Sequence, residues 1–374
     1  EQVRDLLAET RERLGERPWG VGFLGFADPP LLNEQIAVAS EFQPSLAIIA
    51  GGRPGQALDL EAKGIPSYLH VPSPRLLTLF LEQGARHFIF EGRECGGHIG
   101  PLASLVLWES MVESLLAQLP NIPEPGEIHL LFAGGIHDER SAALVAVLAA
   151  PLTARGVKIG VLLGSAYLFT PEITASGAIT PAFQQAALEC RRTVSLETGP
   201  GHASRCAATP FAEQFFIARQ RLREQGLRGA ALRLALEQLN LGRLRLASKG
   251  QERDTEGRLH PVSEERQRQE GMYMIGQAAT LRDARISLAE LHHAVSDGAL
   301  AVLRQHVATH PAPVTGCPPA PADIAIIGMG VLLPGANDIR QYWENILDQV
   351  SAIREIPPHR WDWRRYFAAD RRAR

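Results

Sequence analysis

The sequence predicts an α/β fold: a (β/α)8 TIM barrel, of which six strand–helix units are visible, followed by a mostly helical extension. In the first 170 residues, short apolar runs that end in glycine or proline alternate with amphipathic stretches. Continuously apolar runs are typical of parallel strands that are buried on both faces. Two glycine-rich turns that could hold a phosphate come last in this series, where a barrel places its phosphate site. A doubly wound sheet places that site after its first strand instead.

The expected strands alternate with helical stretches along the chain. The strands occupy residues 20–26, 46–52, 65–72, 87–92, 129–135 and 157–165. A complete barrel needs eight strands, so these would be strands 3 to 8, with two units missing at the amino end. An open doubly wound sheet of six strands is the alternative that the strand count leaves open. The chain begins with Glu1 and its last residues close no visible element, so we expect both ends to be cut from a longer polypeptide.

Four parts follow one another along the chain. Residues 1–170 are expected to form the amino-terminally truncated barrel. Residues 171–308 are rich in helix formers and arginine and are expected to be a helical extension of the same domain. Residues 309–322 are rich in proline, which is typical of a semi-extended linker. Residues 323–374 open a new strand-to-loop unit and are expected to begin a further domain.

Composition and charge exclude several classes of protein. The formal net charge of the 374 residues is −3, so neither a nucleic acid nor an anionic membrane surface is expected as a partner. No apolar run reaches the roughly 20 residues of a membrane helix, and no signal peptide is visible. The four cysteines form no CxxC pair, which favours a reducing cytoplasm over a disulfide framework.

The last two expected strands end in turns without bulky side chains, "AGGI" at 133–136 and "LLGS" at 162–165. Phosphate binding requires backbone N–H groups at close range, and side chains obstruct that approach. Helices that begin after these turns would add their positive dipole ends. We therefore predict that Gly134, Gly135, Gly164 and Ser165 bind a phosphate, although tight strand ends would also use glycine.

The stretch "EGRECGGHIGP" at 91–101 follows the fourth expected strand. Gly96 and Gly97 would let a flat ring system approach the backbone, and His98 could transfer protons beside it. A loop histidine that donates to a carbonyl is the alternative. Cys95 and His98 lack the further ligands that a metal requires, so no metal site is expected. Cys95 also lacks a partner base that would make it a nucleophile.

These motifs resemble those of a known family. "EGRECGGHIGP", "FAGGI" and "LLGSAYLFTPE" are similar to the EGxEAGGHxG, AGGI and G[TS]xF segments of the nitronate monooxygenase (2-nitropropane dioxygenase) family of FMN-dependent TIM barrels. "GRLRLASKG", "GMYMIGQAA" and "LAELHHAVS" are similar to its enoyl-reductase subgroup in polyketide and polyunsaturated-fatty-acid synthases. Residues 324–362 resemble the opening of a ketosynthase domain. The chain departs from the family in lacking the opening QAPM-like strand, in having Gly22 for an amide residue, and in having Cys95 for alanine.

The resemblance implies an FMN-dependent oxidoreductase with NAD(P)H as the reductant and His98 as the general acid/base. The residues that it implies at the cofactor are Gly22, Gly96, Gly97, Gly134, Gly135, Gly164 and Ser165. The ketosynthase start favours an enoyl thioester on an acyl carrier protein as the substrate and other domains of the same synthase as partners. Nitronate oxidation with O2 and a non-catalytic barrel that serves as a structural or docking domain are the alternatives, and a homodimer stays open.

Overall fold

The computed structural model describes residues 2–309, 328–357 and 359–363. By its contacts the chain divides into two compact units, Glu1–His310 and Pro311–Arg374. The proline-rich linker expected at 309–322 lies outside the described residues except for Thr309. Among the described residues of the second unit, one helix is present, α15 (Ile339–Leu347).

A six-stranded parallel sheet organises the first unit. Its strands are β1 (Gly20–Leu24), β2 (Leu46–Ala50), β3 (Ser67–His70), β4 (His87–Glu91), β6 (His129–Ala133) and β7 (Lys158–Leu162). They lie side by side in chain order, with β1 and β7 at the outer edges of the sheet. Consecutive order is the arrangement of a β/α barrel, whereas a doubly wound sheet reverses its order part-way. The predicted barrel-type α/β fold is therefore confirmed, and each of the six expected strands is present.

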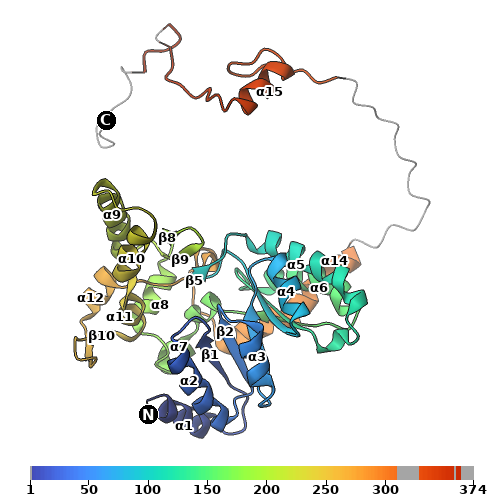
Figure 1. Cartoon of the computed structure of the whole chain (residues 1–374), viewed down its shortest axis with the longest axis vertical. Coiled ribbons are helices and arrows are strands. Elements are labelled where there is room, and N and C mark those ends of the chain that lie inside the picture. The colour runs from blue at the N-terminus through green and yellow to red at the C-terminus, as the bar shows by residue number, and fades with distance from the viewer. Residues whose placement is uncertain (1, 310–327, 358, 364–374) are drawn as a thin grey trace. The chain divides into compact units, whose positions relative to one another are not determined.

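Helices cover one face of this sheet because alternate strand residues are apolar. Phe23, Ile49, Leu69, Phe88 and Phe132 point from successive strands into one core with these helices. The helices are α1 (Gln2–Leu14), α2 (Pro29–Phe42), α3 (Pro54–Glu61), α4 (Pro74–Glu82), α5 (Ser104–Gln118) and α6 (Glu139–Thr153). Helix α14 (Ala299–Thr309) packs against α6 and returns the carboxyl-terminal part of the unit to the barrel helices (Figure 1).

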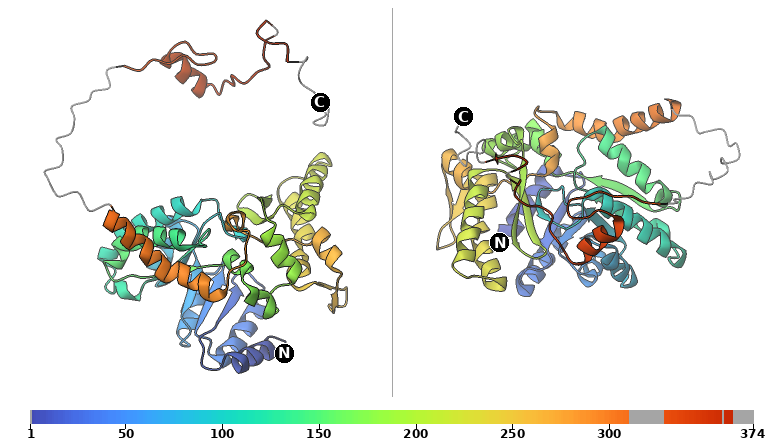
Figure 2. Two further views of the ribbon diagram at one scale, coloured as in Figure 1. Left: turned by 180° about the vertical axis from the view of Figure 1, so that it is seen from behind. Right: turned by 90° about the horizontal axis from the view of Figure 1, so that it is seen from above.

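The extension after β7 contains a sheet that the sequence analysis did not predict. Strand β9 (His202–Ala207) pairs antiparallel with both β8 (Thr193–Gly199) and the short β5 (Gly97–Ile99). The helices of the extension are α7 (Pro171–Ala175), α8 (Pro181–Leu188), α9 (Pro210–Glu224), α10 (Gly229–Asn240), α11 (Arg243–Lys249), α12 (Glu264–Glu270) and α13 (Leu288–His293). Helices α9 to α12 gather on one side of the unit and α4 to α6 on the other, in both views (Figure 2). The extension is mostly helical, but its small sheet is what holds residues 97–99.

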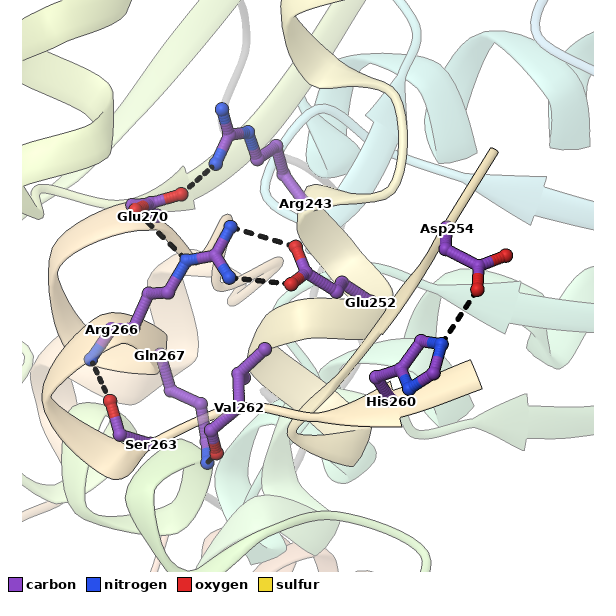
Figure 3. Close-up of polar contacts among 9 residues, drawn as sticks. All are labelled: Arg243, Glu252, Asp254, His260, Val262, Ser263, Arg266, Gln267 and Glu270. Atoms are coloured by element: carbon purple, nitrogen blue, oxygen red, sulfur yellow. Dashed lines mark hydrogen bonds and ion pairs between the residues drawn. The ribbon is translucent and has the colours of Figure 1, made fainter. Parts of the chain in front are cut away.

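A network of charged side chains joins the hairpin of β10 (Gln251–Arg253) and β11 (Leu259–Pro261) to α12 (Figure 3). Arg266 binds both carboxylate oxygens of Glu252, at 2.6 and 2.7 Å. Its Nε also donates to Glu270, which accepts from Arg243 at 2.6 Å. The network is partly exposed, so we interpret it as a structural clasp of the extension.

Candidate active site

The turns after β4, β6 and β7 meet around one pocket of about 250 Å3. Gly96 belongs to the turn after β4, Gly134 and Gly135 follow β6, and Gly164 and Ser165 follow β7. The structure therefore brings together five of the residues that the sequence predicts at a cofactor. Their binding of a cofactor stays a prediction.

The backbone requires glycine at the turn after β6 but not at the turn after β7. Gly134 and Gly135 have φ values of +104° and +81°, in the left-handed region that other residues rarely adopt. A Cβ on Gly134 would also lie 2.7 Å from Oγ of Ser104. Gly164 has a φ of −117°, and a Cβ there would meet no heavy atom within 4 Å. Neither steric contact nor φ therefore requires glycine at position 164. The space that a Cβ would occupy there is free, and Gly164 lines the pocket.

The segment that ends in Gly276 closes the pocket from the side of the extension. The amide of Gly276 donates to Oγ of Ser165 at 2.7 Å. Gly96 and Gly276 touch so closely that a Cβ on Gly96 would lie 2.7 Å from the amide nitrogen of Gly276. Close backbone packing therefore explains the glycine at Gly96 without reference to a ligand.

Two carboxylates border the pocket, and both are held by other partners. Glu94 accepts hydrogen bonds from the amide and the hydroxyl of Ser104, at 2.8 and 2.6 Å, and so satisfies the start of α5. Glu91 pairs with Nδ1 of His70 at 2.9 Å. The lining residues include no lysine or arginine, so an anion here would depend on backbone N–H groups and the Ser165 hydroxyl.

Of the two helix starts expected at these turns, a short 3-10 helix (Ser165–Phe169) begins directly after Gly164, whereas the other lies away from its turn. Helix α6 begins at Glu139, several residues after Gly135. The side chain of Asp138 already accepts from the amide of Ser141 at 2.9 Å and caps this helix. The start of α6 is thus occupied by an acidic residue of the chain itself.

His98 lines a neighbouring cavity of about 790 Å3 and does not border the pocket of the glycine turns. It lies on β5, opposite Ser204 of β9, and its side chain is exposed. Met274 borders both the pocket and this cavity, so the two spaces adjoin. The imidazole of His98 forms no hydrogen bond or ion pair with any residue that the structure describes, which leaves both ring nitrogens available.

A buried arginine fixes the loop between β4 and β5. Nε of Arg205 donates to the carbonyl of Arg93 at 2.9 Å, and Nη1 donates to Oγ1 of Thr193 at 2.9 Å. Cys95 lies in this loop, and burial raises the pKa of its thiol far above the ordinary value. A thiol that stays protonated is a poor nucleophile, in agreement with the absence of a partner base.

Two of the residues predicted at the cofactor, Gly97 and Gly22, border neither the pocket of the glycine turns nor the His98 cavity. Gly97 has a φ of +92° and pairs with Arg205 in the small sheet. Gly22 lies on the edge strand β1, where a Cβ would meet nothing within 4 Å. Met274 and Gly276 were not predicted as site residues, although both belong to the "GMYMIGQAA" segment that resembles the enoyl-reductase subgroup. His202, which lines the His98 cavity, was not predicted either.

No group of three histidine, cysteine, aspartate or glutamate side chains in the described ranges is arranged to hold a metal ion. No helix in the described part of the chain is both long and apolar enough to cross a bilayer.

Two families match different parts of the chain. Residues 3–297 match the nitronate monooxygenase family, and residues 322–374 match the amino-terminal domain of β-ketoacyl synthases. The polyketide synthase ThaG of Burkholderia thailandensis is 51% identical over 45 residues. These residues are 12% of this chain and 1% of that synthase, so the chain spans a very small part of this relative.

Solved structures share the fold of the first unit. FabK of Thermotoga maritima has a TM-score of 0.62 and 22% identity, over 82% of this chain and 83% of that one. The enoyl reductase domain of MlnA, from the macrolactin cluster of Bacillus amyloliquefaciens, has a TM-score of 0.59 and 12% identity, over 82% and 87%. A nitroalkane oxidase of Streptomyces ansochromogenes has a TM-score of 0.55 and 18% identity, over 81% and 87%.

Proposed function

Because the chain belongs to the nitronate monooxygenase family, whose members are flavin-dependent oxidoreductases, we propose that residues 1–308 use FMN to reduce an enoyl thioester. The thioester is carried by an acyl carrier protein, and NAD(P)H is the reductant. One observation carries the proposal: the pocket of the glycine turns adjoins the His98 cavity through Met274. In this proposal, a cofactor in the pocket and a proton donor in the cavity would be neighbours in one unit.

The residues of the pocket suit the phosphate of FMN. The turns at Gly134, Gly135 and Gly164 present backbone without side chains, and the hydroxyl of Ser165 can donate. By the family resemblance, Gly96 and Gly97 would lie close to the ring system and Gly22 would also belong to the cofactor site, but Gly97 and Gly22 border neither the pocket nor the His98 cavity. When bound, the flavin supplies hydride transfer, whereas the protein supplies binding, orientation and proton handling.

His98 protonates the α-carbon of the thioester in this proposal. Its ring has no partner among the described residues and lines an open cavity, so it can exchange its proton with water. Histidine is suited to this task because its charge changes near neutral pH. A positioned general acid contributes roughly 10²–10⁴ to the rate.

The carboxyl-terminal match supports an acyl substrate. Residues 322–374 of the same polypeptide match the start of a ketosynthase, a domain class that extends acyl thioesters. An oxidoreductase joined to such a domain acts on the same tethered chains, with the other domains of the synthase as its partners. The enoyl reductase domain of MlnA, from the macrolactin biosynthesis cluster, shares the fold.

Nitronate oxidation is the second candidate, and the family match favours it. In that reaction His98 would remove a proton from the carbon next to the nitro group, and O2 would reoxidise the flavin. The pocket and the cavity serve both reactions. The two differ in the electron donor, which is NAD(P)H in one case and the nitronate in the other.

Flavin reduction in the absence of oxygen tests the proposal. The absorbance spectrum of the purified chain first shows whether flavin is bound. Stopped-flow mixing with NADPH, NADH or a nitronate then shows which donor bleaches the flavin. Rapid bleaching by a nicotinamide, followed by reoxidation with an enoyl thioester, is the expected result. Bleaching by the nitronate alone would favour the second candidate, and a chain that binds no added flavin would favour a non-catalytic barrel.

A further inference from the structure

A third cavity, of about 520 Å3, adjoins the His98 cavity. We call it the basic cavity because Arg93, Arg219, Arg223 and Arg228 line it, against one carboxylate, that of Glu197. Helix α9 supplies Arg219 and Arg223, and the loop to α10 supplies Arg228. The whole chain carries a net charge of −3, so this concentration of arginine is a local feature.

Most of this positive charge is not neutralised. Arg93 pairs with Glu197 at 3.6 Å. Among the described residues, Arg219, Arg223 and Arg228 form no ion pair with a carboxylate. Arg219 lies over the ring of Phe216, 5.2 Å from its centroid, and Nη1 of Arg228 donates to the carbonyl of Leu227 at 2.7 Å. Such contacts orient guanidinium groups without neutralising them, and so leave the cavity attractive to an anion.

The turn between β8 and β9 forms another wall of the basic cavity and is open to a ligand. It contains Gly199, Pro200 and Gly201, which all line the cavity. Gly201 has a φ of +73°, and a Cβ there would meet nothing within 4 Å. A ligand can therefore approach this backbone closely.

The basic cavity and the His98 cavity have a common wall. Thr198, His202 and Ala203 line both of them. A ligand anchored by an anionic group among the arginines can thus extend past His202 toward His98. Arg233 and Glu237 both line the His98 cavity and pair with each other at 3.6 Å. The negative charge of Glu237 is therefore compensated by Arg233.

We propose that the basic cavity binds the phosphate of a phosphorylated substrate whose reacting end enters the His98 cavity. Arginine binds phosphate strongly because its planar N–H groups match the phosphate oxygens. This inference rests on the proposed function for its reacting end. Two substrates of that reaction carry phosphate: the phosphopantetheine arm of a tethered thioester and the nucleotide half of NAD(P)H.

A double variant, Arg223→Gln with Arg228→Gln, tests the proposal in the flavin-loaded chain. Crotonyl-coenzyme A carries phosphate, whereas crotonyl-N-acetylcysteamine carries none. We expect KM for the first thioester to rise about tenfold or more, the effect of losing one charge-assisted hydrogen bond, with KM for the second unchanged. A control double variant, Arg221→Gln with Arg304→Gln, removes two exposed arginines that border none of the three cavities and should change neither KM.

The outcomes distinguish the two sources of phosphate. A rise in KM for NADPH, with both thioester KM values unchanged, supports a phosphate site occupied by the nucleotide. An equal change for both thioesters, or no change for any substrate, overturns the proposal. Thermal unfolding of the variants shows whether they keep the fold.

Direct binding keeps this inference separable from the proposed function. Calorimetric titration of coenzyme A and of NADPH into the chain needs no turnover. If coenzyme A or NADPH binds more weakly to the cavity variant but normally to the control variant, the phosphate site is supported, even if the chain does not reduce enoyl thioesters. Equal binding of both ligands by both variants overturns it.

Discussion

The backbone amide of Gly276 donates to Oγ of Ser165 across 2.7 Å, between residues that are 111 positions apart in the chain. This bond joins the segment that carries Met274 to the turn after β7. Because Oγ of Ser165 accepts here and has no acceptor for its own proton among the described residues, its hydroxyl can still donate to an anion. One side chain thus closes the pocket and faces its expected ligand.

Replacing Ser165 by alanine removes both functions. We expect the dissociation constant for FMN to rise about tenfold or more, because one hydrogen bond to a charged phosphate contributes about 1.5–3 kcal/mol. Titration of flavin fluorescence measures it. Ser176→Ala, an exposed hydroxyl on the surface of the same unit, is the control and should leave flavin affinity unchanged. Equal affinity in wild type and Ser165→Ala would remove Ser165 from the cofactor site.

Alanine substitutions at Gly164 and Gly96 should have separate effects, the first on flavin binding and the second on folding stability. A Cβ at position 164 would contact no other atom, and the φ of Gly164 suits alanine. Gly164→Ala should therefore keep the melting temperature, but its methyl group should weaken FMN binding by occupying space in the phosphate pocket. A Cβ at Gly96 would press on the backbone of Gly276, so Gly96→Ala should destabilise the fold by about 1–3 kcal/mol. Thermal unfolding without flavin and flavin titration measure the two effects. A Gly164→Ala chain with wild-type flavin affinity would argue against a phosphate at this turn.

His98→Ala should slow turnover without releasing the flavin. We expect a decrease of roughly 10²–10⁴ in kcat for enoyl reduction, the usual contribution of a positioned general acid. Reduction of the flavin by NADPH should stay fast because no proton from His98 is needed in that half-reaction. His202→Ala is the matched variant in the same cavity. If His202→Ala loses turnover and His98→Ala does not, the proton donor is His202.

The sequence predicted the parallel sheet well and the surroundings of His98 poorly, for a physical reason. Apolar runs that end in glycine report local burial, so all six parallel strands lie within the expected ranges, and the family resemblance is confirmed at both ends of the chain. Strand β5 has three residues and pairs with Ala203–Arg205, more than a hundred positions away. No periodicity can develop in three residues, so the sequence analysis placed His98 only after the end of the fourth expected strand and predicted no strand there. Gly276 was missed similarly, because only its distant partner Ser165 reveals its role.

The charged clasp of the extension gives a pH-dependent prediction. The hydrogen bonds from Arg266 lower the pKa of Glu252, and those from Arg243 and Arg266 lower the pKa of Glu270 (Figure 3). A carboxylate whose pKa is lowered by folding stabilises the protein above its ordinary pKa, and this stabilisation is lost as the pH falls through the lowered value. Arg266→Gln should therefore lower the melting temperature at neutral pH, and the difference from wild type should narrow below about pH 4.

Thermal unfolding at neutral pH and at about pH 3.5 measures this difference. Added salt should also narrow it, because both partners are partly exposed and the ions screen them. Arg268→Gln is the control on the same helix, since Arg268 forms a single pair with Glu264 one turn away. It should change the melting temperature less than Arg266→Gln, because Arg266 alone bridges Glu252 of the hairpin and Glu270 of α12. A difference that persists unchanged at acid pH would mean that Arg266 stabilises the extension through packing of its stem and not through these carboxylates.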